Sequence, residues 1–407
     1  MNQQKPRIAV VSPFLDKQHG TERPVVEWLN RAADSFDIYI YSQQIEGLDM
    51  SRMVWRRIPK IPGPHLLRYI WWFAANHAWR AWDKQFRGRV PDLVYSPGIN
   101  CFDADIISVH IMFAELLRRN LHSMRLAEHS WREWPRLLHR RLYYKLILKL
   151  ERGIYPDPEV SLLVISRRVS RGLQQFYGRQ DPSAVVYFGL DREAFNPQRR
   201  SDLRVVARRQ LHLPDDEFVL LLIGNDWLNK GLPLLLEAMS LLRELPLHLL
   251  VVGQDDFLPY QALIREKALS GRVRFLPPRK DVEYYYAAAD AYAGPSKEDA
   301  LPLPPAEAMA CGLPVIVTTQ CGVAEIIVDG ENGLVMQDAL DVADLASKVK
   351  RLYEDRDARE RLGEKAAETA QQYDWNRSGR EFVDLLQEAL RKKNLAASRR
   401  TSLQREL

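Results

Sequence analysis

The sequence predicts an α/β protein made of two Rossmann-like domains, each built on a parallel sheet. Three observations support this prediction: the chain has 407 residues, short apolar runs alternate with helical patterns, and the alternation starts again at residue 217. A chain of this length exceeds the usual size of one domain. Strands that alternate with helices are typical of parallel sheets covered on both faces.

The first half of the chain contains five short apolar runs that are typical of buried strands. The run at 7–14 precedes a helical pattern from Thr21 to Ala33, with Thr21 as the expected N-cap and Pro24 in the first turn. We assign residues 1–190 to this N-terminal domain. Its other strand candidates are 37–42, 92–97, 105–110 and 160–166.

The second half repeats this pattern, and we assign residues 191–372 to a C-terminal domain. Strands are predicted at 217–225, 248–254, 272–276, 290–296 and 313–319, and helices at 232–242, 260–269, 281–289 and 306–310. The Gly- and Pro-containing segment 185–198 is the expected joint. Residues 373–407 are predicted to form a C-terminal helix with a basic tail, which packs back toward the N-terminal domain. Ligands of open parallel sheets bind beyond the carboxyl ends of strands, so we expect a site in a central cleft that both domains face.

Charge is distributed unevenly between the halves. Residues 1–200 hold 31 Lys and Arg against 20 Asp and Glu, whereas the remainder holds 27 against 33. This surplus favours an anionic partner of the N-terminal domain. The basic stretch 116–152 and the aromatic stretch 68–82 suit either an anionic membrane surface or ordinary helix packing with a solvated basic face. Nucleic acid is not expected, because the sequence shows no nucleic-acid-binding signature.

The location predicted from the sequence is cytoplasmic, with peripheral attachment to the inner face of the membrane as a further possibility. No apolar run approaches the length of a membrane span, and the N-terminus lacks the flanks of a signal peptide. The sequence also lacks the glycine patterns of dinucleotide-binding and NTP-hydrolysing loops.

The segment from Gly294 to Met336 carries the most specific motif. It reads GPSKEDALPLPPAEAMACGLPVIVTTQCGVAEIIVDGENGLVM, with acidic residues Asp299 and Glu307 before AMACG. This segment closely resembles the donor-binding signature of glycosyltransferase family 4, whose members have the GT-B fold. Shorter matches follow the same order along the chain: SPF with HGTER at 12–23, SVHI at 108–111, VIS at 164–166, FGLD at 188–191, GNDWLNKG at 224–231 and VVGQD at 251–255.

The resemblance implies a role for each residue of a nucleotide-sugar site. Glu307 corresponds to the carboxylate that accepts hydrogen bonds from the ribose hydroxyls, Asp299 faces the hydroxyls of the donor sugar, and Lys230 binds the diphosphate. Leu301 and Leu303 lie in the loop that holds the sugar and diphosphate. A helix that starts beside this loop points backbone donors and a partial positive charge toward an anionic leaving group.

The N-terminal domain is expected to contribute His110 and Gly20. His110 resembles the family histidine that approaches the donor sugar near the reacting carbon, and Gly20 allows donor or acceptor to come close. We assign His110, Asp299 and Lys230 to catalysis. Asn225 is placed in the donor site, although many members have Arg there, and Pro302 stands where many have Gly and lacks a backbone N–H.

The function implied by the resemblance is a retaining glycosyltransferase. It would move a sugar from a nucleotide diphosphate sugar, with a UDP-sugar favoured over GDP-mannose, to a glycan or lipid-linked acceptor in cell-surface polysaccharide or lipopolysaccharide synthesis. No metal ion and no cofactor are expected, because cationic side chains and helix N-termini stabilise the leaving diphosphate. Two alternatives remain: a nucleotide-sugar epimerase of the same architecture, and a non-catalytic protein that binds sugar nucleotides or glycans. Donor turnover with an acceptor separates them.

Overall fold

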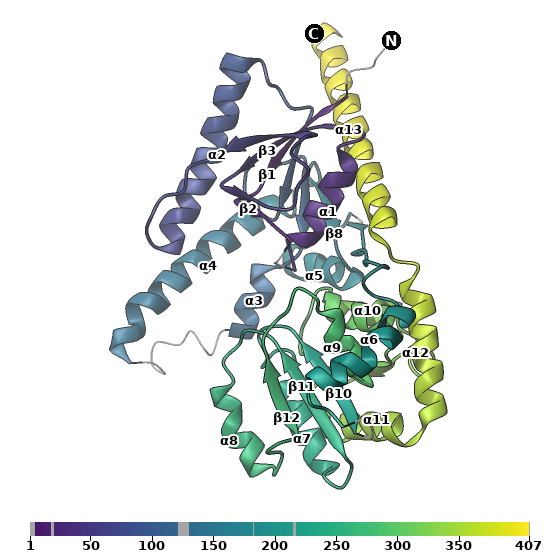
Figure 1. The fold of residues 1–407 in the computed structure, drawn as a ribbon. Helices are drawn as coiled ribbons and strands as arrows, with labels where there is room; N and C mark the ends of the chain where they lie inside the picture. Colours follow the sequence, from purple (N-terminus) through teal and green to yellow (C-terminus); the bar gives the residue numbers. More distant parts are fainter. Residues whose placement is uncertain (1–4, 18–19, 121–129, 182, 215–216, 407) are drawn as a thin grey trace. The chain divides into compact units, whose positions relative to one another are not determined.

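The computed structural model describes residues 5–17, 20–120, 130–181, 183–214 and 217–406. They form two compact units, which we call the N-terminal unit, Met1–Tyr187 with Trp375–Leu407, and the C-terminal unit, Phe188–Asp374. The domain boundaries predicted from the sequence lie after residues 190 and 372. Figure 1 shows the elements of each unit, which are described separately. The cleft predicted between them stays a prediction.

The N-terminal unit contains a seven-stranded parallel sheet in the order β5-β3-β1-β6-β7-β8-β9. A short parallel pair of β2 (Phe14–Leu15) and β4 (Gln44–Ile45) stands beside it. The strands of the main sheet are β1 (Arg7–Val11), β3 (Asp37–Ser42), β5 (Met53–Arg57), β6 (Leu93–Pro97), β7 (Ile106–Val109), β8 (Ser161–Val164) and β9 (Ala184–Val185).

Helices of the N-terminal unit follow the strands as the sequence pattern predicts. They are α1 (Arg23–Ala32), α2 (His65–Arg87), α3 (Phe113–Asn120), α4 (Trp134–Ile154), α5 (Arg167–Tyr177) and α13 (Trp375–Glu406), with a short 3₁₀ turn at Trp131–Glu133. The aromatic stretch lies in α2, where Trp72 is buried and Trp82 is exposed. One side of this stretch therefore packs within the unit, whereas Ile70 and Trp82 lie at its surface.

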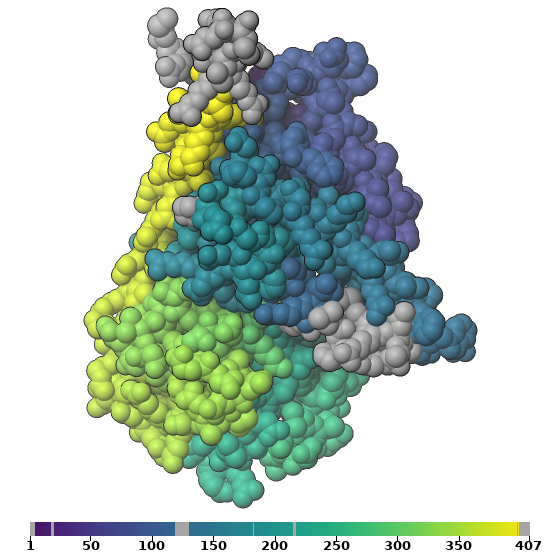
Figure 2. All heavy atoms as spheres, turned by 180° about the vertical axis from the view of Figure 1, so that it is seen from behind, coloured from purple at the N-terminus to yellow at the C-terminus, as the bar shows by residue number. Residues whose placement is uncertain are grey.

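The C-terminal helix α13 packs on the N-terminal unit beside α1 (Figure 1). Trp28 of α1 stacks on Phe382 at 5.2 Å between ring centroids, and its indole N–H donates to the Ser378 hydroxyl at 2.6 Å. The same hydroxyl donates to the Tyr187 carbonyl at 2.7 Å. In Figure 2 the yellow helix lies against the blue-green surface of this unit. These contacts fix the first turns of α13 to α1 and to the segment that follows β9.

The C-terminal unit contains a six-stranded parallel sheet in the order β12-β11-β10-β13-β14-β15. Its strands are β10 (Phe218–Ile223), β11 (Leu247–Val252), β12 (Val273–Leu276), β13 (Ala291–Gly294), β14 (Val315–Thr318) and β15 (Leu334–Met336). Its helices are α6 (Pro197–Gln210), α7 (Leu232–Leu241), α8 (Leu258–Glu266), α9 (Glu283–Ala288), α10 (Leu303–Ala310), α11 (Val342–Glu354) and α12 (Arg356–Ala370), with a 3₁₀ turn at Gly322–Ile326.

Both faces of this second sheet are buried, which explains its continuous apolar strands. In β10, Val219 and Leu221 pack in one apolar cluster, whereas Leu220 and Leu222 pack in another. Parallel strands covered on both faces carry such unbroken runs, because successive side chains point to opposite faces. The predicted fold class, two α/β domains with parallel sheets, is confirmed.

Two details differ from the sequence-based expectations. Thr21 is not the N-cap of α1: Glu22 occupies that position and makes no side-chain cap, while the Thr21 hydroxyl donates to the Glu22 carboxylate. Strands β4, β5, β9 and β15 were not predicted. The residues of β5 are partly polar and half exposed, and β4, β9 and β15 are very short, so none of the four shows a long apolar run.

Candidate functional site

The structure brings Lys230 and Asp299 together in the C-terminal unit. Lys230 ends the loop after β10, Asp299 lies in the loop after β13, and the ammonium and carboxylate form an ion pair. Their side chains are 14% and 17% exposed. Burial lowers the pKa of Lys230, but the charge of Asp299 and its hydrogen bond outweigh this effect, so the pKa is raised above its usual value. Lys230 is therefore protonated, and its positive charge is already balanced by the carboxylate of Asp299.

The two loops are held together by close backbone contacts. Gly231 has φ +83°, and a Cβ there would lie 2.3 Å from the Pro295 carbonyl oxygen, so only glycine fits. The Asn229 amide donates to the Glu298 carbonyl at 2.8 Å, and the Asn229 carbonyl accepts from the Lys297 N–H at 2.8 Å. These bonds place Lys230 beside Asp299 without help from a ligand.

Asn225 is exposed, and its side chain has a structural contact. Its amide oxygen accepts from the Gln254 N–H at 2.8 Å, which joins the loop after β10 to the loop after β11. The side-chain NH₂ group has no hydrogen bond to any residue that the structure describes. A role of Asn225 in donor binding stays a prediction.

The start of α10 offers fewer backbone donors than an ordinary helix N-terminus. The helix begins at Leu303, and Pro302 occupies the N-cap position with no side-chain cap. Pro304 and Pro305 follow, so Leu303 carries the only N–H among residues 302–305. The side chains of Leu301 and Leu303 pack against the apolar cluster, so we expect their backbone N–H groups to serve a ligand.

Glu307 lies inside α10 and is 5% exposed. One of its carboxylate oxygens accepts from the Tyr286 hydroxyl at 2.8 Å. Burial, reinforced by the neighbouring carboxylate, raises the pKa of Tyr286 well above its usual value, so the phenol stays protonated and donates. The helix and this bond fix the carboxylate, and its role toward a ribose stays a prediction.

His110 directly follows β7 in the N-terminal unit and is buried. Its Nε2 lies 3.1 Å from the Ser108 hydroxyl, which lies 2.8 Å from the Tyr95 hydroxyl. Burial lowers the pKa of His110 to about 4, and a hydrogen bond with the Thr21 backbone offsets only part of this. The imidazole is therefore neutral near pH 7.

Gly20 lies in the loop that reaches His110. The contact between His110 and the Thr21 backbone brings this loop to the end of β7, so the structure places the two predicted residues of the N-terminal unit close together. A Cβ at Gly20 would meet no atom within 4 Å. The protein itself therefore does not require glycine here, and close approach of a ligand remains the predicted reason for it.

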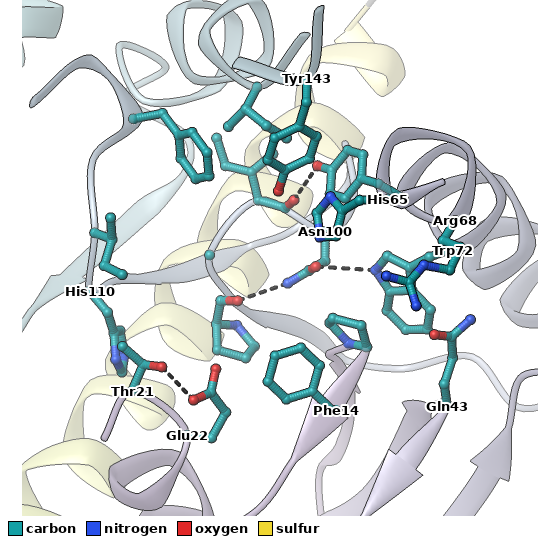
Figure 3. Close-up of a pocket in the computed structure, with 18 of the residues that line it drawn as sticks. Phe14, Thr21, Glu22, Gln43, His65, Arg68, Trp72, Asn100, His110 and Tyr143 are labelled. Carbon is teal, nitrogen blue, oxygen red and sulfur yellow. Dashed lines mark hydrogen bonds between the residues drawn. The ribbon is translucent and has the colours of Figure 1, made fainter. Parts of the chain in front are cut away.

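A cavity of about 640 Å³ extends from His110 across the carboxyl ends of the strands of the N-terminal unit (Figure 3). The sequence did not predict its other walls, which include Lys60, His65, Arg68, Trp72, Asn100 and Glu151. Glu151, which burial gives a pKa of about 7, accepts from the Phe113 N–H at 2.9 Å and so fixes the start of α3. In the sequence, the only indication of Glu151 was that an acidic residue occurs among the apolar positions of a basic helical stretch.

Among the residues that the structure describes, no group of three or more His, Cys, Asp or Glu side chains is placed to hold a metal ion. The expectation that no metal is required stays a prediction. Within the same ranges, every helix is too short or too polar to cross a membrane.

Known proteins resemble the C-terminal unit. Residues 205–369 match the family model described as Glycosyl transferases group 1. The chain is also 30% identical over 243 residues to a D-inositol 3-phosphate glycosyltransferase of Xylanimonas cellulosilytica, which covers 57% of this chain and 58% of that protein. The chain spans about half the length of the curated relatives it matches. Residues 205–369 are thus similar to glycosyltransferase group 1 domains.

Solved structures show where the fold recurs. The crystal structure of WaaG, a glycosyltransferase involved in lipopolysaccharide biosynthesis, aligns with a TM-score of 0.73 at 21% identity, over 93% of this chain and 99% of that one. Anabaena HepE in complex with UDP-glucose aligns with a TM-score of 0.66 at 17% identity, over 94% and 99%. At these identities the likeness shows the fold, which is that of GT-B glycosyltransferases.

Proposed function

We propose that the chain is a retaining glycosyltransferase that uses a nucleotide diphosphate sugar. A UDP-sugar is favoured over GDP-mannose, since the HepE structure contains UDP-glucose. The acceptor is a glycan or lipid-linked saccharide of cell-surface polysaccharide or lipopolysaccharide synthesis. The Lys230–Asp299 ion pair, located at the strand ends of a unit similar to glycosyltransferase group 1 domains, carries the proposal.

Donor binding exchanges the partner of Lys230. The diphosphate takes the ammonium from Asp299, and the released carboxylate then accepts hydrogen bonds from the hydroxyls of the donor sugar. The N–H of Leu303 and the positive end of α10 add to the charge that faces the diphosphate. Since Pro302, Pro304 and Pro305 donate nothing, Lys230 carries an unusually large share of this stabilisation.

The transfer itself joins the acceptor hydroxyl oxygen to the anomeric carbon. The bond from that carbon to the β-phosphate oxygen breaks, and the hydroxyl proton goes to the departing nucleoside diphosphate. Attack on the face that the leaving group vacates retains the configuration. The neutral imidazole of His110 can donate or accept a hydrogen bond without adding a charge near the reacting carbon.

The proposal is tested by incubating the full chain with UDP-sugars or GDP-mannose and saccharide acceptors in EDTA. We expect a glycoside with the anomeric configuration of the donor, observed by NMR, at a rate that EDTA does not change, because Lys230 and α10 supply the positive charge. Release of an epimerised nucleotide sugar without acceptor would assign an epimerase instead. Activity lost in EDTA and restored by Mg²⁺ would overturn the metal-free mechanism.

Glu307→Gln is expected to weaken nucleoside diphosphate binding about 5- to 150-fold, because an amide accepts the ribose hydroxyls less strongly than a carboxylate. Gln still accepts from Tyr286, so the fold should remain intact. Calorimetry with UDP or GDP measures the effect. Tyr286→Phe is the matched control: it removes the same hydrogen bond but keeps the carboxylate, and it should change affinity far less. Unchanged affinity in a folded Glu307→Gln protein would show that this carboxylate does not bind the ribose.

An anionic membrane surface remains a proposed partner of the N-terminal unit. Trp131, Trp134, Leu138 and Leu142 are exposed along one side of α4 and the turn before it. Arg132 and Arg136 are exposed among them, so apolar and basic groups occur together as in interfacial helices. Part of the basic stretch, at 121–129, lies outside the described residues.

A further inference from the structure

The cavity of the N-terminal unit has two chemically different ends (Figure 3). His110, Thr21 and Glu22 line one end, and these groups are neutral or acidic near pH 7. Arg68 and His65 line the other end. Lys60, which also lines the cavity, directly follows Pro59, whose carbonyl accepts from Gln43 and from Trp71 of the same helix as Arg68. A ligand that spans the cavity therefore meets a hydrogen-bonding end and a cationic end.

The cations at the second end lack anionic partners. Lys60 donates to the amide oxygen of Gln44 at 2.6 Å, which is a neutral group. Neither Lys60 nor Arg68 forms an ion pair with any residue that the structure describes. The pKa of His65 is lowered, first by burial and then by the charge of Arg68, so His65 stays neutral and can donate or accept a hydrogen bond. Two unpaired positive charges that line one cavity favour an anion.

The start of α2 adds to this preference. His65 and Arg68 belong to the first turn of this 23-residue helix, which has no side-chain cap. The N-terminus of a helix carries a partial positive charge. The Leu66 N–H donates to His139 Nε2 at 3.3 Å, whereas the N–H groups of His65 and Leu67 have no partner among the described residues. A phosphate bound between Lys60 and Arg68 would therefore also lie near the favourable end of the helix.

The middle of the cavity is rigid and aromatic. The indole N–H of Trp72 donates to the Asn100 amide oxygen at 3.1 Å, and the Asn100 amide donates to the Pro97 carbonyl at 2.8 Å. Tyr69 is fixed by its hydroxyl bond to the Ile99 carbonyl at 2.7 Å. Flat aromatic walls with a few fixed polar groups suit the apolar face and hydroxyls of a sugar or cyclitol ring.

We infer that this cavity binds a polyhydroxylated acceptor that carries a phosphomonoester, with the phosphate on Lys60 and Arg68 and the nucleophilic hydroxyl toward His110. This inference rests on the proposed function and names the class of its acceptor. The phosphate belongs either to a soluble sugar phosphate or to a lipid-linked one, since the cations recognise the same group in both.

The test compares glucose 6-phosphate with glucose as calorimetric ligands of the full chain. We expect the phosphorylated sugar to bind at least about tenfold more tightly, because charged hydrogen bonds are stronger than neutral ones, and to bind less tightly as salt rises. Lys60→Ala with Arg68→Ala should abolish the difference. Lys84→Ala is the matched control, an exposed cation further along α2 and outside this cavity. Equal affinity for both sugars in the native chain would exclude a soluble sugar phosphate as the bound group.

A second arm uses phosphatidylcholine vesicles with and without phosphatidic acid. Preference for phosphatidic acid that the double variant loses assigns the phosphate to a lipid, and preference for glucose 6-phosphate alone assigns it to a soluble acceptor. If the protein prefers the phosphate-bearing ligand in neither arm, the proposed acceptor class is wrong. Donor turnover is measured on the same samples. Phosphate binding without turnover refutes only the proposed function. Turnover that does not depend on the phosphate of the acceptor refutes only the acceptor class.

Discussion

Lys230→Ala is expected to lower kcat/KM for the nucleotide sugar by about 10²- to 10³-fold, the range seen when a preorganised group that stabilises developing charge is removed. The physical reason is the shortage of other positive groups. Asn225 is neutral, and Leu303 alone has an N–H at the start of α10. Initial rates over a range of donor concentrations give the effect on kcat and KM separately.

Lys297→Ala is the matched control for this prediction. Lys297 belongs to the loop after β13 and is exposed, and its backbone N–H, which the substitution keeps, donates to Asn229. We expect the control to retain most of the native rate. A thermal melt of each variant checks that loss of the ion pair has not unfolded the C-terminal unit. Native activity in a folded Lys230→Ala protein would remove Lys230 from the mechanism.

The apolar pattern predicted the fold because both sheets are buried on both faces. The run FVLLLI of β10 could be recognised since every residue packs into one of two clusters. Met53–Arg57 could not, because β5 is an edge strand with exposed Val54 and Arg57. At Thr21, local capping preference predicted the N-cap, but the side chain bonds to Glu22 instead.

The candidate site was predictable to the extent that a motif carried it. Asp299 and Glu307 were found by resemblance, but the ion pair between Asp299 and Lys230 joins residues that are 69 positions apart and depends on how the loops cross. Lys60 and Arg68 follow the edge strand that was missed, and their spacing has no periodic signal. Such a cluster appears only when the strand ends are placed in space.

The neutralised lysine leads to a second expected result with a large effect. In the unliganded protein, Asp299 holds the ammonium of Lys230. We therefore expect a diphosphate that binds Lys230 to have to displace the carboxylate. Breaking the ion pair costs free energy. A donor that carries a sugar can offset this loss, because the hydroxyls of the sugar can bind the released carboxylate. A nucleoside diphosphate without a sugar cannot. The pair therefore favours the intact donor over the spent nucleotide, and it should help the product to leave.

Asp299→Asn is accordingly expected to change binding and turnover in opposite directions. UDP or GDP should bind more tightly by a factor on the order of 10, because Lys230 no longer has an anionic partner, while kcat should fall about 10²-fold as the sugar loses its charged acceptor. Calorimetry and product-inhibition kinetics measure the two effects. Glu298→Gln, which removes one negative charge from the neighbouring position in the same loop, should reproduce neither. Weaker nucleotide binding in Asp299→Asn would mean that the carboxylate orients Lys230 for the diphosphate rather than competing with it.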